Sequence, residues 1–254
     1  MFDSNVWRKI ALPEENMDDP QYETLVKIHD AIADGRIEAY ISENIFTLEN
    51  IPRKERKEKV GSMRAKTTIK EKSDADRVSI GVTLGPNPAD AVSLDDHEYL
   101  RKPTEAALKI GFRIVRLPRI GGLTNSDIED KLYQVQDFES YHNKATEVGG
   151  QIESKGAGFS HLEALIKNYP GRSISDKVKN APESDKNKIA AAIAEAVDGD
   201  AVATSIGLGC DYFCTRDEAK GAGATSVFSK TNLSWLESQY GFIVKKPEEI
   251  ATLL

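Results

Sequence analysis

Helix-forming and strand-forming stretches alternate toward the C-terminus, and this alternation most constrains the fold. The alanine-rich stretch 186–197 has high helix propensity, and the Asp-Gly-Asp sequence at 198–200 is expected to interrupt it. A further helix is expected over 201–208, because Gly209 follows it as a suitable C-terminal cap. The next segment, 210–215, is rich in strand-forming residues. Strands that alternate with helices predict parallel strands joined by helical crossovers.

The N-terminus and the last residues of the chain fit the same plan. Alternating apolar residues, helical periodicity and glycine stops define the further elements. Strands are expected at 1–2, 37–42 and 242–244, and helices at 21–33, 43–50 and 248–254. We therefore expect an α/β fold with a mostly parallel central sheet.

The middle of the chain, 53–154, does not continue this plan. It opens with a basic stretch, 53–72, in which nine Lys or Arg residues stand against three Glu. Strand-like segments follow at 77–84 and 111–118, and a helical region at 126–148. We expect an inserted α+β region here, with 1–52 and 155–254 forming the core. The basic stretch is a candidate for holding a nucleic-acid backbone, against the alternative of a solvated surface.

The composition favours a folded protein without a membrane span or a disulfide framework. Of 254 residues, 39% are hydrophobic, which is enough to bury a large core. No apolar stretch reaches the roughly 18 residues of a membrane helix, and no secretory signal is expected. Cys210 and Cys214 are too few for a disulfide framework and are expected to be reduced and packed near a strand. The expected location is cytoplasmic, with no membrane partner.

The net charge and the histidines argue against a protein that coats nucleic acid and against a histidine-ligated metal site. The net charge of −7 argues against a protein that coats nucleic acid non-specifically. It does not exclude a nuclease, because bound cations change the local sign of an acidic site. The four histidines show no metal-ligand spacing and are expected to be structural or solvated.

Four acidic residues stand at the ends of expected elements rather than at random positions. Asp3 ends the first strand, and Glu49 follows the second. Asp198 is expected to open the helix before the 210–215 strand, and Asp217 follows that strand. In an open parallel sheet, ligands bind outside the carboxyl ends of the strands. If these segments are neighbours, the four carboxylates meet in one crevice.

Clustered carboxylates are suited to hard divalent cations. Like charges close together raise one another's pKa, so such a cluster needs counter-ions. Oxygen-only ligands favour Mg²⁺ or Mn²⁺, which can activate water and stabilise an in-line displacement at phosphorus. The alternative is that these acids are ordinary helix caps and first-turn residues, where the helix dipole favours negative charge.

The stretch DGDAVATSIGLGCDYFCTRD, 198–217, closely resembles the third and fourth acidic motifs of the PIN-domain nuclease family. The start, FDSNV at 2–6, resembles the first motif, usually Asp-Thr-Asn, and TLE at 47–49 resembles the second. The resemblance covers about 1–52 and 160–254. It implies a three-layer α/β/α fold with Rossmann-like topology. The 53–154 insertion is not part of the family pattern.

The resemblance implies a metal-dependent nuclease, most often an endoribonuclease, here acting on single-stranded RNA. Its Mg²⁺ or Mn²⁺ ligands would be Asp3, Glu49, Asp198 and Asp217, with Asp200 and Glu43 as alternates for the third and second acids. Asn5 and Thr215 would orient the ligating carboxylates, and Arg216 would contact a phosphate or form a surface salt bridge.

Other functions stay open at this point. A phosphatase of the aspartyl-phosphate type also begins with an Asp after a strand, but it needs a second Asp where Asn5 stands. A degenerate PIN-like module that binds RNA or protein without cutting is a second alternative. A toxin ribonuclease of a toxin–antitoxin pair is a third, although such chains are normally much smaller. Cleavage of DNA and assembly as a homodimer also stay open.

Overall fold

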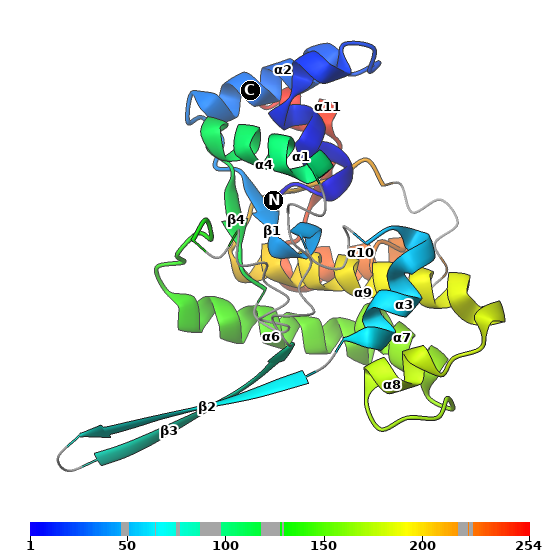
Figure 1. Ribbon diagram of the computed structural model, residues 1–254. Coiled ribbons are helices and arrows are strands. Elements are labelled where there is room, and N and C mark those ends of the chain that lie inside the picture. The colour runs from blue at the N-terminus through cyan, green and yellow to red at the C-terminus, as the bar shows by residue number, and fades with distance from the viewer. Residues whose placement is uncertain are drawn as a thin grey trace.

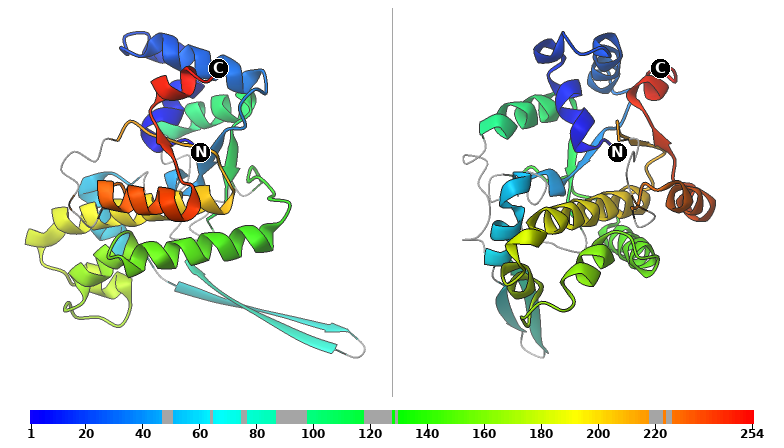
Figure 2. Two further views of the ribbon diagram at one scale, coloured as in Figure 1. Left: turned by 180° about the vertical axis from the view of Figure 1, so that it is seen from behind. Right: turned by 90° about the vertical axis from the view of Figure 1, so that its right-hand side faces the viewer.

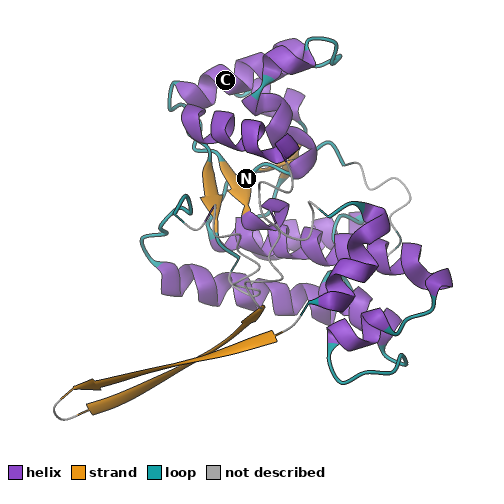
Figure 3. Ribbon diagram, viewed as in Figure 1, coloured by secondary structure: helices purple, strands orange, loops and turns teal. Residues whose placement is uncertain are grey.

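Helices make up most of the described chain; four short strands lie among them, and two longer strands form a hairpin outside them (Figure 3). The computed structural model describes residues 1–46, 51–63, 65–74, 77–86, 98–117, 128, 130–217, 223 and 226–254. The helices are α1 (Ser4–Ala11), α2 (Tyr22–Ala33), α3 (Arg56–Ser62), α4 (Glu98–Ile110), α6 (Phe138–Ser154), α7 (Phe159–Ile166), α8 (Ile174–Lys179), α9 (Lys186–Gly207), α10 (Lys230–Tyr240) and α11 (Pro247–Ala251). The strands are β1 (Tyr40–Ser42), β2 (Ala65–Asp74), β3 (Arg77–Pro86), β4 (Arg113–Val115), β5 (Phe213–Cys214) and β6 (Val244–Lys245).

The described strands form small sheets rather than one long one. β1 pairs with β4 and β5 pairs with β6, both in parallel, and β2 pairs with β3 in antiparallel orientation. The N-terminal residues lie between the two parallel pairs: the Phe2 amide donates to the Tyr40 carbonyl at 2.8 Å, and the Asp3 amide donates to the Cys214 carbonyl at 2.9 Å. The chain segments therefore follow one another in the order β4, β1, residues 1–3, β5, β6. The expected parallel pairing is present, and the sheets are shorter than expected.

Residues of these strands alternate between two hydrophobic clusters, as the pleat of a strand requires. Phe2, Ile41, Ile114 and Cys214 belong to a cluster that includes residues of α1, α2, α4 and α11. Met1 and Phe213 belong to a second cluster, with residues of α6, α9 and α10. Figures 1 and 2 show these two groups of helices on opposite sides of the strands. The short strands are thus buried between helices on both faces.

α9 is one continuous helix of 22 residues, Lys186–Gly207, so the expected interruption at 198–200 is wrong. Gly199 lies inside the helix because another backbone approaches it: a Cβ atom there would be 2.9 Å from the Gly158 Cα. Glycine costs a helix roughly 1 kcal/mol relative to alanine, which packing against a neighbouring segment can offset. Asp198 therefore lies within a helix, and it does not open one.

The segment expected as an insertion, 53–154, is not packed apart from the rest of the molecule. Within it, β4 pairs with β1, α6 packs along α9, and α4 contributes Leu100 and Ala107 to the first cluster. The β2–β3 hairpin extends away from the remaining described elements (Figure 1). The strand expected within 111–118 is present as β4, over Arg113–Val115, and residue 118 lies outside the described residues. α6 begins at Phe138 and covers the second half of the helical region expected at 126–148; residues 126, 127 and 129 lie outside the described residues.

Several elements were not expected from the sequence, among them α1, α4 and α10. α1 begins directly after Asp3, whose carboxylate caps it, so the first strand and the first helix share one residue. Both cysteines are free, and Cys214 is buried in β5, where burial raises the pKa of its thiol to about 12. None of the helices in the described ranges combines the length and apolar character that crossing a membrane requires.

Candidate active site

Asp3 is held at the carboxyl end of the N-terminal segment by hydrogen bonds from three residues. Its Oδ1 accepts from the Ser4 amide at 2.6 Å, which caps α1. Its Oδ2 accepts from the Thr215 hydroxyl at 2.5 Å and from the Asn5 amide group at 2.8 Å. Hydrogen bonds to a carboxylate favour its charged form and fix its orientation. Asp3 is thus a positioned carboxylate and more than a helix cap.

Thr215 connects the ends of two neighbouring strands. Its hydroxyl donates to Asp3, and accepts from the Asn5 side chain at 3.1 Å and from the Asp217 amide at 2.9 Å. The Asn5 side-chain oxygen in turn accepts from the Arg216 amide at 3.0 Å. One hydroxyl donor and two acceptor positions are the full capacity of a threonine. Hydrogen bonds therefore connect residues 3–5 to residues 215–217, although the two segments lie more than 200 positions apart in the chain.

The pKa of the Asp3 carboxyl is raised above its ordinary value, chiefly by burial. The hydrogen bonds from Thr215 and Ser4 lower this pKa, and the nearby negative charge of Asp217 raises it again. Asp3 and Asp217 are therefore close enough to interact electrostatically. A cation bound between such carboxylates would relieve both the desolvation and the repulsion.

Asp198 and Asp217 line one pocket of about 330 Å³. α9 also contributes Glu195, which lies one turn before Asp198 on the same face of the helix. The pocket wall further includes Arg53 and Arg56, from the start of the basic stretch. Two of the predicted acids and two arginines of the basic stretch 53–72 thus line one cavity.

Glu195 also lines the pocket, and the sequence patterns did not predict it as a site residue. Its Oε1 accepts from the Val227 amide at 2.5 Å and from the Gly158 amide at 3.3 Å. Burial raises the pKa of the Glu195 carboxyl, although these hydrogen bonds lower it. The spacing of three residues between Glu195 and Asp198 is the signal that would have found it, but that spacing has meaning only if α9 is read as continuous.

The remaining predicted acids lie elsewhere or outside the described residues. Glu49 falls in 47–50, which is outside the described residues. The alternates Asp200 and Glu43 are both buried and are not among the residues that line the pocket. The Glu43 Oε1 accepts from the Leu117 amide at 2.8 Å. The structure therefore places Asp3 near Asp217, and Asp198 and Asp217 in one pocket, whereas Asp3 does not line that pocket. It leaves the second acid undefined.

Arg216 forms a salt bridge, which is one of the two roles expected for it. Its guanidinium contacts both carboxylate oxygens of Asp19, at 2.8 and 3.0 Å, and the Lys9 ammonium contacts Asp19 at 2.6 Å. The Asp19 side chain is only 5% exposed. Hydrogen bonds from Arg216 hold the pKa of Asp19 well below its ordinary range. The Arg216 guanidinium thus contacts Asp19, which no sequence pattern singled out.

The donor chemistry of the site suits Mg²⁺ or Mn²⁺, since Asp3, Asp198 and Asp217 offer only oxygen ligands. Within the part of the chain that the structure describes, no three His, Cys, Asp or Glu side chains are grouped closely enough to hold a metal ion. Glu49 lies outside that part. Neither a protein-family model, a curated protein nor a solved structure matches the chain.

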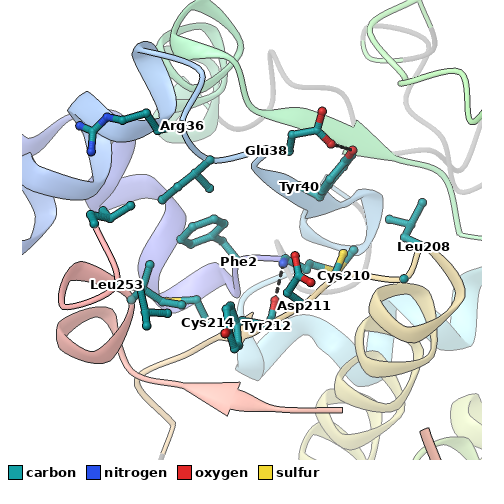
Figure 4. A pocket seen from close by; sticks show the side chains of 15 residues that line it. Phe2, Arg36, Glu38, Tyr40, Leu208, Cys210, Asp211, Tyr212, Cys214 and Leu253 are labelled. Atoms are coloured by element: carbon teal, nitrogen blue, oxygen red, sulfur yellow. Dashed lines mark hydrogen bonds between the residues drawn. The ribbon is translucent and has the colours of Figure 1, made fainter. Parts of the chain in front are cut away.

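A larger pocket, of about 560 Å³, lies at the opposite ends of the strands (Figure 4). Its lining includes Phe2, Tyr40 and Asp211, and the Met1 amine donates to the Tyr212 carbonyl at 2.7 Å. These residues precede or begin the strands, whereas ligands of parallel sheets bind beyond their carboxyl ends. None of the predicted acids lines this pocket.

Proposed function

We propose that the protein is a metal-dependent nuclease that hydrolyses phosphodiester bonds and acts as an endoribonuclease on single-stranded RNA. The observation that carries this proposal is the Thr215 hydroxyl, which donates to Asp3 and accepts from the Asp217 amide, together with the pocket that Asp198 and Asp217 both line. Asp3 and Asp217 follow neighbouring parallel chain segments, and ligand sites form beyond the carboxyl ends of such segments, which supports the proposal.

The proposed fold is the three-layer α/β/α arrangement of PIN-like nucleases. In it, β4, β1, residues 1–3, β5 and β6 form one parallel sheet with the N-terminal segment at its centre. The hydrogen bonds of Phe2 to Tyr40 and of Asp3 to Cys214 support this order. The two hydrophobic clusters on opposite faces of the strands support the three layers.

Asp3, Asp198 and Asp217 would hold the metal, together with Glu49 as the fourth acid. A bound Mg²⁺ or Mn²⁺ supplies an activated water and neutralises charge that develops on the phosphate. Asn5 and Thr215 keep the Asp3 carboxylate in one orientation, since both donate to its Oδ2. Fixed partners of this kind are what a ligand carboxylate needs to hold its geometry.

Arg53 and Arg56 would attract the phosphate of the substrate to the pocket. Arg56 is anchored, because its guanidinium donates to the Ile51 carbonyl at 3.1 Å and to the Ala190 carbonyl at 3.3 Å. Arg53 is exposed at the pocket wall. Arginine is suited to this role because its planar guanidinium can contact two phosphate oxygens at once.

The test is cleavage of a mixed RNA pool with Mn²⁺, with EDTA and with Asp217→Asn. This variant keeps the size of the side chain but removes a charge that the metal needs, so we expect a rate loss of about 100-fold or more. The matched control is Asp211→Asn, at the other end of β5, which is exposed and should leave the rate unchanged.

Two results would contradict this assignment. Cleavage that survives both EDTA and Asp217→Asn would have to arise from another site. RNA binding without cleavage in any metal would favour the degenerate module that binds and does not cut. The same assay on single-stranded DNA shows whether the enzyme selects RNA.

A further inference from the structure

The β2–β3 hairpin is a long two-stranded arm. Its ten residue pairs run from Ala65 opposite Pro86 to Asp74 opposite Arg77, without a bulge. The arm extends away from the helices (Figures 1 and 3). Ten residues of strand span about 33 Å at a rise of roughly 3.3 Å per residue. The arm therefore reaches well beyond the body of the molecule.

The register of the arm sorts its residues onto two faces of different chemistry. Alternate residues of a strand lie on one face, and directly paired residues share a face. The pairs Lys66–Gly85, Lys70–Gly81, Lys72–Ser79 and Asp74–Arg77 therefore lie on one face. Its cationic residues are Lys66, Lys70, Lys72 and Arg77, against the single acid Asp74. The apolar residues of the hairpin occupy the other face: Ile69, Val78, Ile80, Val82 and Leu84.

This sorting cannot be seen in the basic stretch alone, because Arg77 comes from the second strand and lies beyond that stretch. The structure also divides the stretch. Lys57, in α3, is buried and contacts Glu183 at 3.1 Å, and Arg56 is anchored at the pocket. The lysines at 66, 70 and 72 instead follow one line along the arm. The run of similar residues is thus divided between the body of the molecule and the arm.

We infer that the basic face of this arm binds the phosphate backbone of the RNA, as a second contact surface beyond the catalytic pocket. The whole chain carries a net charge of −7, so a face with four cations and one acid is a local exception that selects a polyanion. Gly81 and Gly85 lie on the same face, and glycine within a strand permits close approach of a ligand. The inference rests on the proposed function for the identity of the polymer.

The test removes the four charges by Lys66→Gln, Lys70→Gln, Lys72→Gln and Arg77→Gln together. Binding of labelled single-stranded RNA is measured by fluorescence anisotropy in EDTA, over a series of salt concentrations. Four lost phosphate contacts should reduce the slope of log K against log salt by about 3, at roughly 0.7 per contact. Affinity at low salt should fall about tenfold or more.

Two controls separate position from charge and from folding. The first removes the same number and kind of charges at exposed sites elsewhere: Lys109, Lys167, Arg172 and Lys230, each to Gln. The second keeps the charges by Lys66→Arg, Lys70→Arg and Lys72→Arg. Both should bind RNA with the slope of the unmodified protein. An arm variant that keeps this slope, or a body control that loses as much, would overturn the inference.

The outcomes also distinguish this inference from the proposed function. RNA binding that depends on the arm, without metal-dependent cleavage, would support RNA binding by the arm and contradict the proposed nuclease activity. Metal-dependent cleavage, with RNA binding that is unchanged in the arm variant, would contradict RNA binding by the arm and leave the nuclease proposal intact. Absence of RNA binding, with arm-dependent binding to phosphatidylcholine–phosphatidylserine vesicles instead, would overturn it in favour of a membrane surface.

Discussion

At the scale of single residues, the site depends on how polar groups are paired. Thr215 is buried, and its hydroxyl joins Asp3, Asn5 and the backbone of Asp217. The Thr215 hydroxyl therefore lowers the pKa of the Asp3 carboxyl and also holds that carboxylate in position. Asp19 shows the same principle outside the pocket, since the Arg216 guanidinium keeps its carboxylate charged although it is buried.

Thr215→Val keeps the shape of the side chain and removes its hydroxyl. Since the hydroxyl lowers the pKa of Asp3, its loss should raise that pKa further. Asp3 would then stay protonated up to a higher pH, and the acid limb of the pH profile of kcat/KM should shift to higher pH. We also expect about a tenfold loss of activity from poorer orientation. Thr215→Ser, which retains the hydroxyl, should keep the original limb; an unmoved limb in Thr215→Val would refute the role of this hydrogen bond.

At the scale of elements, α9 shows how packing decides where a helix runs. Gly199 faces the backbone of Gly158, where a Cβ atom would lie at 2.9 Å. This contact holds α9 against the turn that precedes α7, and it lies next to Asp198 and Glu195. The Gly158 amide also donates to Glu195 at 3.3 Å, so the segment that approaches Gly199 contacts a residue of the pocket wall.

Alanine at two helical glycines should have opposite effects on stability. Gly199→Ala forces the Gly158 backbone to move, and we expect it to lower the free energy of unfolding by about 1–3 kcal/mol. Gly150→Ala, in α6, meets no atom within 4 Å, and better helix propensity should raise that free energy by about 0.5–1 kcal/mol. Urea unfolding measures both. Equal effects of the two substitutions would show that the contact of Gly199 has no energetic weight.

At the scale of the whole molecule, segments that are far apart in the sequence meet at the candidate site. Residues 3–5 and 215–217 are joined by hydrogen bonds, and α9 brings Asp198 to the same side. A ligand that binds all of these acids would connect both ends of the chain. Such a ligand should stabilise the folded molecule as a unit, because the unfolded chain does not assemble the site.

Mn²⁺ should therefore raise the midpoint of thermal unfolding. At a concentration about 100 times its Kd, a ligand of the folded state adds about 2.7 kcal/mol to the free energy of unfolding. Differential scanning calorimetry with and without Mn²⁺ measures this gain without any assay of cleavage. The gain should shrink in Asp217→Asn and persist in Asp211→Asn. A gain of equal size in both variants would place the metal elsewhere.

The sequence by itself determined the local elements whose patterns are strong. The amphipathic period of α2, the strand formers of 213–214 and the glycine after α9 each depend on neighbours a few residues away. The positions of Asp3 and Asp217 at strand ends follow from the same local patterns. Such features are fixed by propensity, which a single sequence contains.

Only the tertiary structure decided the features that depend on residues far apart in the chain. The close approach to Gly199 in α9 comes from Gly158, and the salt bridge of Arg216 comes from Asp19, which lies 197 positions away. The pairing of β4 with β1 made part of the expected insertion a part of the core. Each of these outcomes is a balance between local preference and contacts across the molecule, and those contacts exist only once the chain has folded.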